Sequence, residues 1–156
     1  MNAIQLLRQM HADAKVQLKT ILATSDPAEA LRLWQALQPV LDVHEQLEDR
    51  FVYTPIAEES GPGTPLGDWD ARHEVDVAVA KQLIAAVDKL DSKSPEWRTA
   101  VGRVADVLAR HVMDEEGQIF GRVEQVWGTE RLERVGAEMQ KAMPRASTRT
   151  SARAAR

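Results

Sequence analysis

Two segments of the chain place a histidine four residues before a glutamate and nine before an aromatic residue. They are HEQLEDRFVY, which begins at His44, and HVMDEEGQIF, which begins at His111. On a helix, residues four apart lie on one face, with Cβ atoms about 5 to 6 Å apart. Each segment therefore predicts an imidazole and a carboxylate, of Glu48 or Glu115, that point in one common direction.

The other two of the four histidines each precede one of these segments. His11 lies 33 residues before His44, and His73 lies 38 residues before His111. Four imidazoles and two carboxylates suit a pair of first-row transition ions, with each carboxylate bridging the ions. A single histidine on an apolar helix face is more often a core residue than a ligand. The prediction of a metal site therefore depends on the six residues as a set.

The composition limits the chemistry that the protein can support. The chain has 156 residues, 44% of them hydrophobic, and no cysteine. Its length favours one domain, and the lack of thiols excludes disulfides, thiolate metal sites and iron-sulfur clusters. No segment is apolar over the length needed to span a bilayer, so we expect a soluble, cytoplasmic protein without membrane contact.

Hydrophobic periodicity predicts an all-α protein. Helical patterns and the breaks between them give these ranges: 2–23, 27–57, 69–90, 95–126 and a short last helix over 129–143, with a loop over 58–68. Asp26-Pro27 and Ser94-Pro95 are typical helix starts, and Pro39 predicts a kink or break. Four long helices with short to medium links indicate a four-helix bundle.

Apolar residues at three- and four-residue steps predict which face of each helix is buried. In the third helix the predicted stripe consists of Val75, Val79, Leu83 and Val87. Gly128 is predicted to separate the last helix from the one before it. Residues 1–143 would then form the domain, and residues 144–156, with four arginines and no acid, a disordered basic tail.

The two halves of the chain also resemble each other. If His44 is placed on His111, then Glu48 meets Glu115 and Tyr53 meets Phe120. The ranges 1–58 and 65–125 therefore read as two helical hairpins related by approximate two-fold symmetry. Such symmetry would bring the histidines and glutamates together at the centre of the bundle.

The order His11, then His44 to Glu48, then His73, then His111 to Glu115 resembles the hemerythrin-like family of HHE cation-binding domains. The resemblance covers about residues 1–125. It implies an up-down-up-down bundle that holds two non-heme iron ions with an oxo or hydroxo bridge. It further implies Glu48 and Glu115 as bridging ligands and the four histidines as terminal ligands. Glu45 matches a glutamate that ligates iron in some members. Nitrogen and oxygen ligands also admit zinc or manganese.

Several neighbouring residues have more than one interpretation. Val77 stands where oxygen-carrying hemerythrins have a further histidine, which argues against reversible oxygen carriage. Tyr53, five residues after Glu48, would reach the site as donor or ligand only if the helix rotates or bends; otherwise it is an amphipathic core residue. Four adjacent acids are interpreted as solvated helix faces, with an outer role beside a histidine as the alternative: Glu74, Asp76, Asp114 and Glu116.

The resemblance implies a small diatomic or peroxidic ligand. The first hypothesis is a di-iron oxidoreductase that decomposes peroxide or consumes nitric oxide, in a catalase-like or nitric oxide peroxidase-like reaction. The alternative is an iron, oxygen or redox sensor, or a carrier, without turnover. A protein partner would then respond to the change by contact with the arginine-containing tail. A metal-free helical module is disfavoured by the polar set, and the tail lacks the aromatic residues that would favour nucleic acid.

Overall fold

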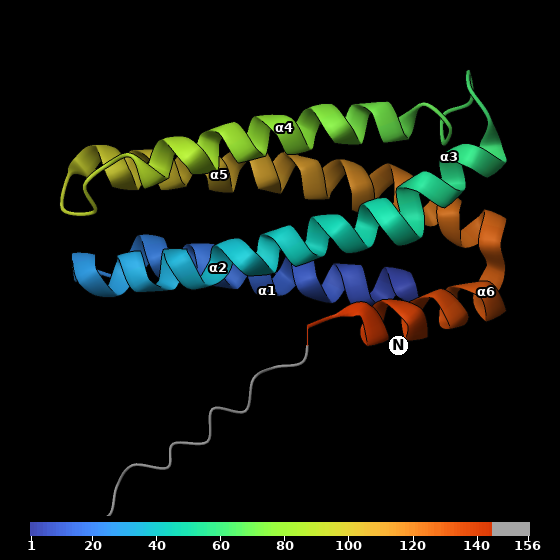
Figure 1. Ribbon diagram of the computed structural model, residues 1–156, viewed down its shortest axis with the longest axis horizontal. Coiled ribbons are helices and arrows are strands. Elements are labelled where there is room, and N and C mark those ends of the chain that lie inside the picture. The colour runs from blue at the N-terminus through green and yellow to red at the C-terminus, as the bar shows by residue number, and fades with distance from the viewer. Residues whose placement is uncertain (145–156) are drawn as a thin grey trace, which may run out of the picture.

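A computed structural model of the chain describes residues 1–144 and shows an all-α protein (Figure 1). The predicted basic tail lies outside the described residues, except for Pro144. Four long helices form the bundle: α1 (Ala3–Ala23), α2 (Pro27–Glu48), α4 (Trp69–Asp88) and α5 (Pro95–Asp114). The remaining elements are η1 (Asp49–Tyr53), α3 (Thr54–Ser60), η2 (Glu115–Ile119) and α6 (Phe120–Ala142). Within residues 1–144, no helix combines the length and apolar character needed to cross a membrane.

The starts of three bundle helices are fixed by side chains that cap them. Asn2 accepts a hydrogen bond from the Gln5 backbone at 2.9 Å, and the Gln5 side chain accepts one from Asn2 in return. Asp26 and Ser94 accept from backbone amides of the next turn and are each followed by proline, as predicted. Each cap contributes about 1 kcal/mol. The caps also set where His11, His44 and His111 fall along their helices.

The predicted break at Pro39 is not found, because α2 runs through this residue from Pro27 to Glu48. Proline removes one hydrogen bond from the helix interior. The turns on both sides are held by packing, since Leu37 and Leu47 are buried in separate apolar clusters. The regular α-helix ends instead immediately after Glu48, where η1 is a π-helical turn.

The interior consists of two apolar clusters. One contains Leu7, Leu47 and Phe120 with their neighbours, and the other contains Leu18, Trp34 and Trp97 with theirs. In the chain order of each bundle helix and the turn that follows it, a histidine lies between buried residues of the two clusters. In α1, for example, His11 follows Met10 of the first cluster and precedes Leu18 of the second. The predicted ligands therefore form a polar layer that divides the core.

Helix α4 is rotated relative to the stripe predicted from its sequence. Val75 is 62% exposed and Val79 is 42% exposed, so this part of the prediction is wrong. The inward face instead follows His73, which is buried, and continues at helical spacing through Val77, Ala80, Ile84 and Val87. Apolar residues surround most of this helix, so burial of the imidazole decides which stripe faces the core.

Gly128 interrupts α6 as predicted, with a φ of 67° that favours glycine. Beyond it the chain turns back and packs against α1, beside the N-terminus (Figure 1). Gly136 makes the closest approach: a Cβ there would lie 2.6 Å from the carbonyl oxygen of Met1 and 2.7 Å from the Ala3 nitrogen. This contact ties the end of the described chain to the helix that carries His11.

Replacing Gly136 by alanine should lower the free energy of unfolding by about 1–3 kcal/mol, because the new methyl group overlaps backbone atoms of residues 1–3. Gly102→Ala is the matched control, since it lies in α5 with open space around it. Alanine there should stabilise the protein by up to about 1 kcal/mol. The free energy of unfolding of each variant is measured by urea titration, with circular dichroism as the signal. Equal changes in the two variants would contradict the close contact at Gly136.

Candidate metal centre

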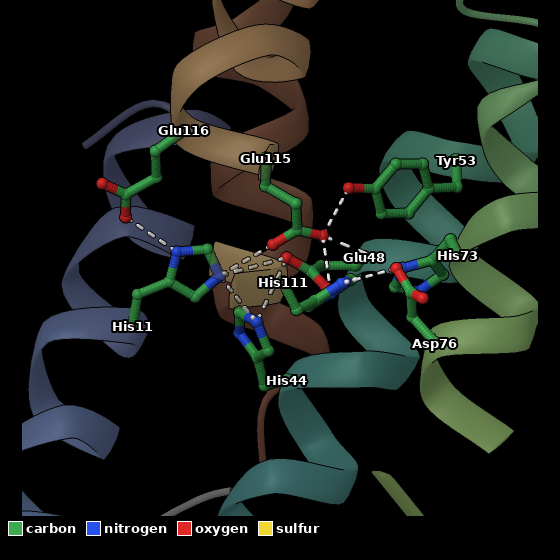
Figure 2. A network of polar contacts seen from close by, with 9 residues as sticks. All are labelled: His11, His44, Glu48, Tyr53, His73, Asp76, His111, Glu115 and Glu116. Carbon is green, nitrogen blue, oxygen red and sulfur yellow. Dashed lines mark hydrogen bonds and ion pairs between the residues drawn. The ribbon is translucent and has the colours of Figure 1, made fainter. Parts of the chain in front are cut away.

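Six predicted residues from all four bundle helices meet in the polar layer (Figure 2). They are His11 on α1, His44 and Glu48 on α2, His73 on α4, His111 near the end of α5, and Glu115 at the start of η2. Glu48 is 1% exposed and Glu115 is fully buried. The two carboxylates thus lie deep in the bundle, where an uncompensated charge is costly.

The six residues form two groups that could each hold a metal ion. One group is His11, His44, Glu48 and Glu115; the other is His73, His111 and the same two glutamates. In each group, the ligand atoms lie within 4.8 Å of one another. Both carboxylates belong to both groups, which is the arrangement that two bridging glutamates would need.

Glu115 directs one oxygen toward each group. Its Oε2 lies 3.2 Å from His11 Nε2, and its Oε1 lies 2.9 Å from His111 Nε2. His73 Nδ1 is 3.8 Å from the same Oε1. Glu48 Oε1 lies 3.1 Å from His44 Nε2 and 3.5 Å from His11 Nε2. The polar atoms therefore face a common interior space from several sides.

Several buried polar atoms of the cluster make no hydrogen bond of good geometry within the described chain, although some lie close to an atom of opposite charge. They are both oxygens of Glu48, Oε2 of Glu115, both ring nitrogens of His73 and Nδ1 of His44. A buried polar group without a partner costs about 1–3 kcal/mol, and a charged one more. Cations placed among these atoms would satisfy them, so the donor set fits metal ions held by nitrogen and oxygen.

The comparisons with known proteins agree with this geometry. Residues 2–123 match the family described as "Hemerythrin HHE cation binding domain". The chain belongs to this family. A protein of Nostoc sp. (strain PCC 7120 / SAG 25.82 / UTEX 2576) named "DNA nickase" is 21% identical over 154 residues, which is 99% of this chain. The chain spans only 42% of that relative's length. No solved structure matches the chain.

The charges in this HHE domain shift the pKa values of its ligands in opposite directions. Burial lowers the pKa of His11, but the close carboxylates of Glu115 and Glu48 outweigh it and raise the pKa to about 10. Burial likewise lowers the pKa of His111, but the carboxylates of Glu115 and Glu48 outweigh it and raise the pKa to about 9. Burial raises the pKa of Glu48, but His44 and His11 bring it well below its usual range. Without metal, the cluster therefore holds protons on imidazoles beside ionised carboxylates.

Two of the four acids interpreted as solvated contact the outer nitrogens of the histidines. Glu116 Oε1 lies 2.8 Å from His11 Nδ1, and Asp76 Oδ2 lies 3.4 Å from His111 Nδ1 (Figure 2). A carboxylate that accepts the Nδ1 proton leaves Nε2 directed at the centre and makes it a better ligand. Glu74 and Asp114 are exposed, as expected of solvated residues.

Tyr53 is brought to the cluster by the π-helical turn η1. On an α-helix it would lie about 140° around the axis from Glu48, whereas hydrogen bonding between residues five apart aligns the two. Its hydroxyl donates to Glu115 Oε1 at 2.5 Å, and its ring stacks on His73 with centroids 4.1 Å apart. Its pKa is raised well above 10 by burial and by the charges of Glu115 and Glu48. It is therefore a phenol at neutral pH.

The second π-helical turn, η2, begins at Glu115 and leads to Phe120, whose ring lies over His11 at 5.7 Å between centroids. Sequence periodicity did not predict either turn, because π-helical residues have no distinctive composition. The signal was nevertheless present in the repeat, where an aromatic residue follows each glutamate by five positions. A spacing of five matches the π-helical hydrogen bond rather than the α-helical one.

Glu45 is not part of either group of potential ligands. Its Oε2 instead pairs with Lys81 Nζ on α4 at 2.9 Å. It lines a cavity between α2 and α4 that also reaches His44, His73 and Glu48. The structure therefore places it at the approach to the cluster, and the sequence could not foresee the competing lysine because it comes from another helix.

Binding of two divalent ions at pH 8 should release about two protons, because His11 and His111 are protonated without metal and must be neutral to ligate. The release should decline as the pH rises through 9 and 10. Calorimetry in buffers of different ionisation enthalpy measures the number of protons. The His11→Gln variant should release about one proton fewer than the wild type. Binding without proton release at pH 8 would contradict the assigned charges.

Replacing Glu116 by glutamine should weaken metal binding by about 10–100-fold, because His11 loses the carboxylate that orients its ring. Asp114→Asn is the matched control, since this exposed acid is close in sequence and has no hydrogen bond or ion pair in the described chain. Competition with a chromogenic chelator measures the affinity. Equal affinities of the two variants would show that Glu116 acts only as a surface charge.

Proposed function

We propose that the protein holds two iron ions in this cluster and uses them to remove a small redox-active molecule, either peroxide or nitric oxide. The support for two ions is the sharing of Glu48 and Glu115 by both groups of ligands. Iron is proposed over zinc or manganese because the family resemblance includes a di-iron centre. Nitrogen and oxygen donors alone do not discriminate among these metals.

The proposed substrate class is based on the cavity that leads from the outside of the bundle to the cluster. It has a volume of about 70 Å³ and lies between α2, α4 and α5, with His44, His73, His111 and Glu48 at its inner end. Its other walls are largely apolar and include Leu41, Val77, Ala80, Ile84, Val107 and Leu108. This space holds only a few molecules of the size of water. It therefore favours a small, uncharged ligand.

A pair of iron ions would supply electrons to, or accept them from, a ligand bound between or beside them. The chain's own residues would do the rest. The apolar walls keep bulk water and large solutes away from the cluster. Tyr53 remains protonated and donates a hydrogen bond to Glu115, which fixes the orientation of this carboxylate. Glu116 and Asp76 keep the imidazoles of His11 and His111 directed inward.

The same site also supports a sensor, in which metal or redox state changes the stability of the bundle and a partner reads the change. The division of the core by the polar layer favours such coupling, since loss of metal leaves buried charges in the middle of the bundle. Turnover of peroxide or nitric oxide would support the enzyme. A change in protease sensitivity with metal or redox state, without turnover, would support the sensor.

The name of the Nostoc relative raises DNA cleavage as a third activity to test, because the similarity extends over 99% of this chain. Residues 1–143 contain 16 basic and 24 acidic residues, so this part carries a charge of −8. Such a charge opposes binding to a phosphate backbone. Incubation of the metal-loaded protein with supercoiled plasmid tests this reaction directly. Iron can also cut DNA by oxidation, so nicks that form without peroxide and that DNA ligase reseals would favour hydrolysis over redox chemistry.

The purified protein should bind two iron ions per chain and show near-ultraviolet charge-transfer absorption. It should also either disproportionate peroxide to water and dioxygen or use peroxide as the oxidant of nitric oxide. Glu115→Ala should abolish this absorption and the turnover, because the carboxylate that faces both groups is lost. Elemental analysis, absorption spectra and an electrode assay measure these properties, with circular dichroism to verify folding. The control is Glu138→Ala, an exposed change on α6. One ion per wild-type chain would overturn the proposal.

A further inference from the structure

A second, outer cavity lies beside the metal centre on the face between α2 and α4. It has a volume of about 210 Å³ and is lined by Glu45, Asp49, His73, Glu74, Val77, Ala78 and Lys81. It shares Glu45, His73, Val77 and Lys81 with the inner cavity. The two cavities therefore adjoin along α4 and connect the protein surface with the cluster.

His73 forms the inner wall of this outer cavity and is also one of the six potential ligands. Its side chain is 2% exposed, and neither ring nitrogen has a hydrogen-bond partner within the described residues. A buried imidazole without a partner is costly. It is therefore a candidate metal ligand whose side chain borders both the outer cavity and the cluster.

The residues that line the outer cavity carry more negative than positive charge. Three carboxylates line it, from Glu45, Asp49 and Glu74, and Asp49 and Glu74 are exposed. Besides His73, Lys81 is the basic residue in the lining, and it pairs with Glu45 at 2.9 Å. Its ammonium group is mostly solvated, with 57% of the side chain exposed, so a divalent cation can displace it from Glu45.

We infer that the outer cavity is a transient divalent-cation site through which the metal reaches the centre. Asp49 and Glu74 attract the hydrated ion, and Glu45 receives it when Lys81 moves aside. His73 then takes the ion from these carboxylates and passes it to the buried glutamates. This inference depends on the proposed metal centre. The same negative charge keeps anions out, which agrees with an uncharged ligand for the inner cavity.

The rate of metal uptake tests the inference separately from the final occupancy. Metal-free protein is mixed with Co²⁺ in a stopped-flow instrument, and visible absorption reports binding to imidazole and carboxylate. Asp49→Asn with Glu74→Gln should slow uptake about tenfold at low salt, because attraction of the ion by the cavity is lost. Two ions per chain should still bind at equilibrium. Added salt should slow the wild type more than this variant.

The matched control is Asp106→Asn with Glu133→Gln, which removes the same charge from exposed positions on α5 and α6. It should take up Co²⁺ at nearly the wild-type rate. Lys81→Gln should accelerate uptake several-fold, because Glu45 is then free to receive the ion. Circular dichroism verifies that all variants fold.

Three results would overturn the inference. Equal uptake rates for the cavity variant and the control variant would show that net charge alone attracts the ion. Slower uptake by Lys81→Gln would show that Lys81 does not compete for Glu45. If the wild type binds fewer than two Co²⁺ ions at equilibrium, the proposed metal centre fails and the inference fails with it. Normal stoichiometry with unchanged rates rejects the cavity site alone.

Discussion

Two carboxylates buried among four imidazoles are the constraint on which the rest of the structure depends. Glu48 and Glu115 have almost no exposure and lie between two apolar clusters. An ionised group in such surroundings is tolerated only with opposite charge close by. Protons on His11 and His111 supply this charge without metal, and metal ions would supply more of it. The bundle is therefore built around a centre that its apolar packing alone would not stabilise.

Local features that look unrelated follow from this constraint. Helix α4 turns His73 inward and leaves Val75 exposed. Two helices change to π-helical turns at their glutamates, which brings Tyr53 and Phe120 against the imidazoles. Each change has a cost in hydrogen bonding or apolar exposure. Each also improves the surroundings of a buried ligand, and this agrees with the occurrence of π-helical turns at functional sites.

The sequence was sufficient to predict the long helices, the capped starts at Asp26 and Ser94 and the six converging residues. These depend on local spacing and on a repeat within one chain. It was not sufficient where the outcome depends on contacts between helices. The pairing of Glu45 with Lys81 and of Glu116 with His11 joins residues distant in sequence. The inward face of α4 was also undetermined, since several of its sides are apolar. Hydrophobic periodicity selects the most apolar face of a helix, whereas the inward face of α4 is the one that carries the His73 imidazole.

The approximate two-fold symmetry of the ligands does not extend to their surroundings. His11 is covered by the ring of Phe120 and its outer nitrogen is engaged by Glu116. Within residues 1–144, neither ring nitrogen of His73 has a hydrogen-bond partner, and this residue lines both cavities, with His111 beside it in the inner one. Tyr53, the counterpart of Phe120, adds a hydroxyl group on this side alone. Of the four histidines, His11 is the one that lines neither of these two cavities. With metal bound as proposed, exchange of small molecules and of metal is expected on the side of His44, His73 and His111, while Phe120 and Glu116 hold His11 in place.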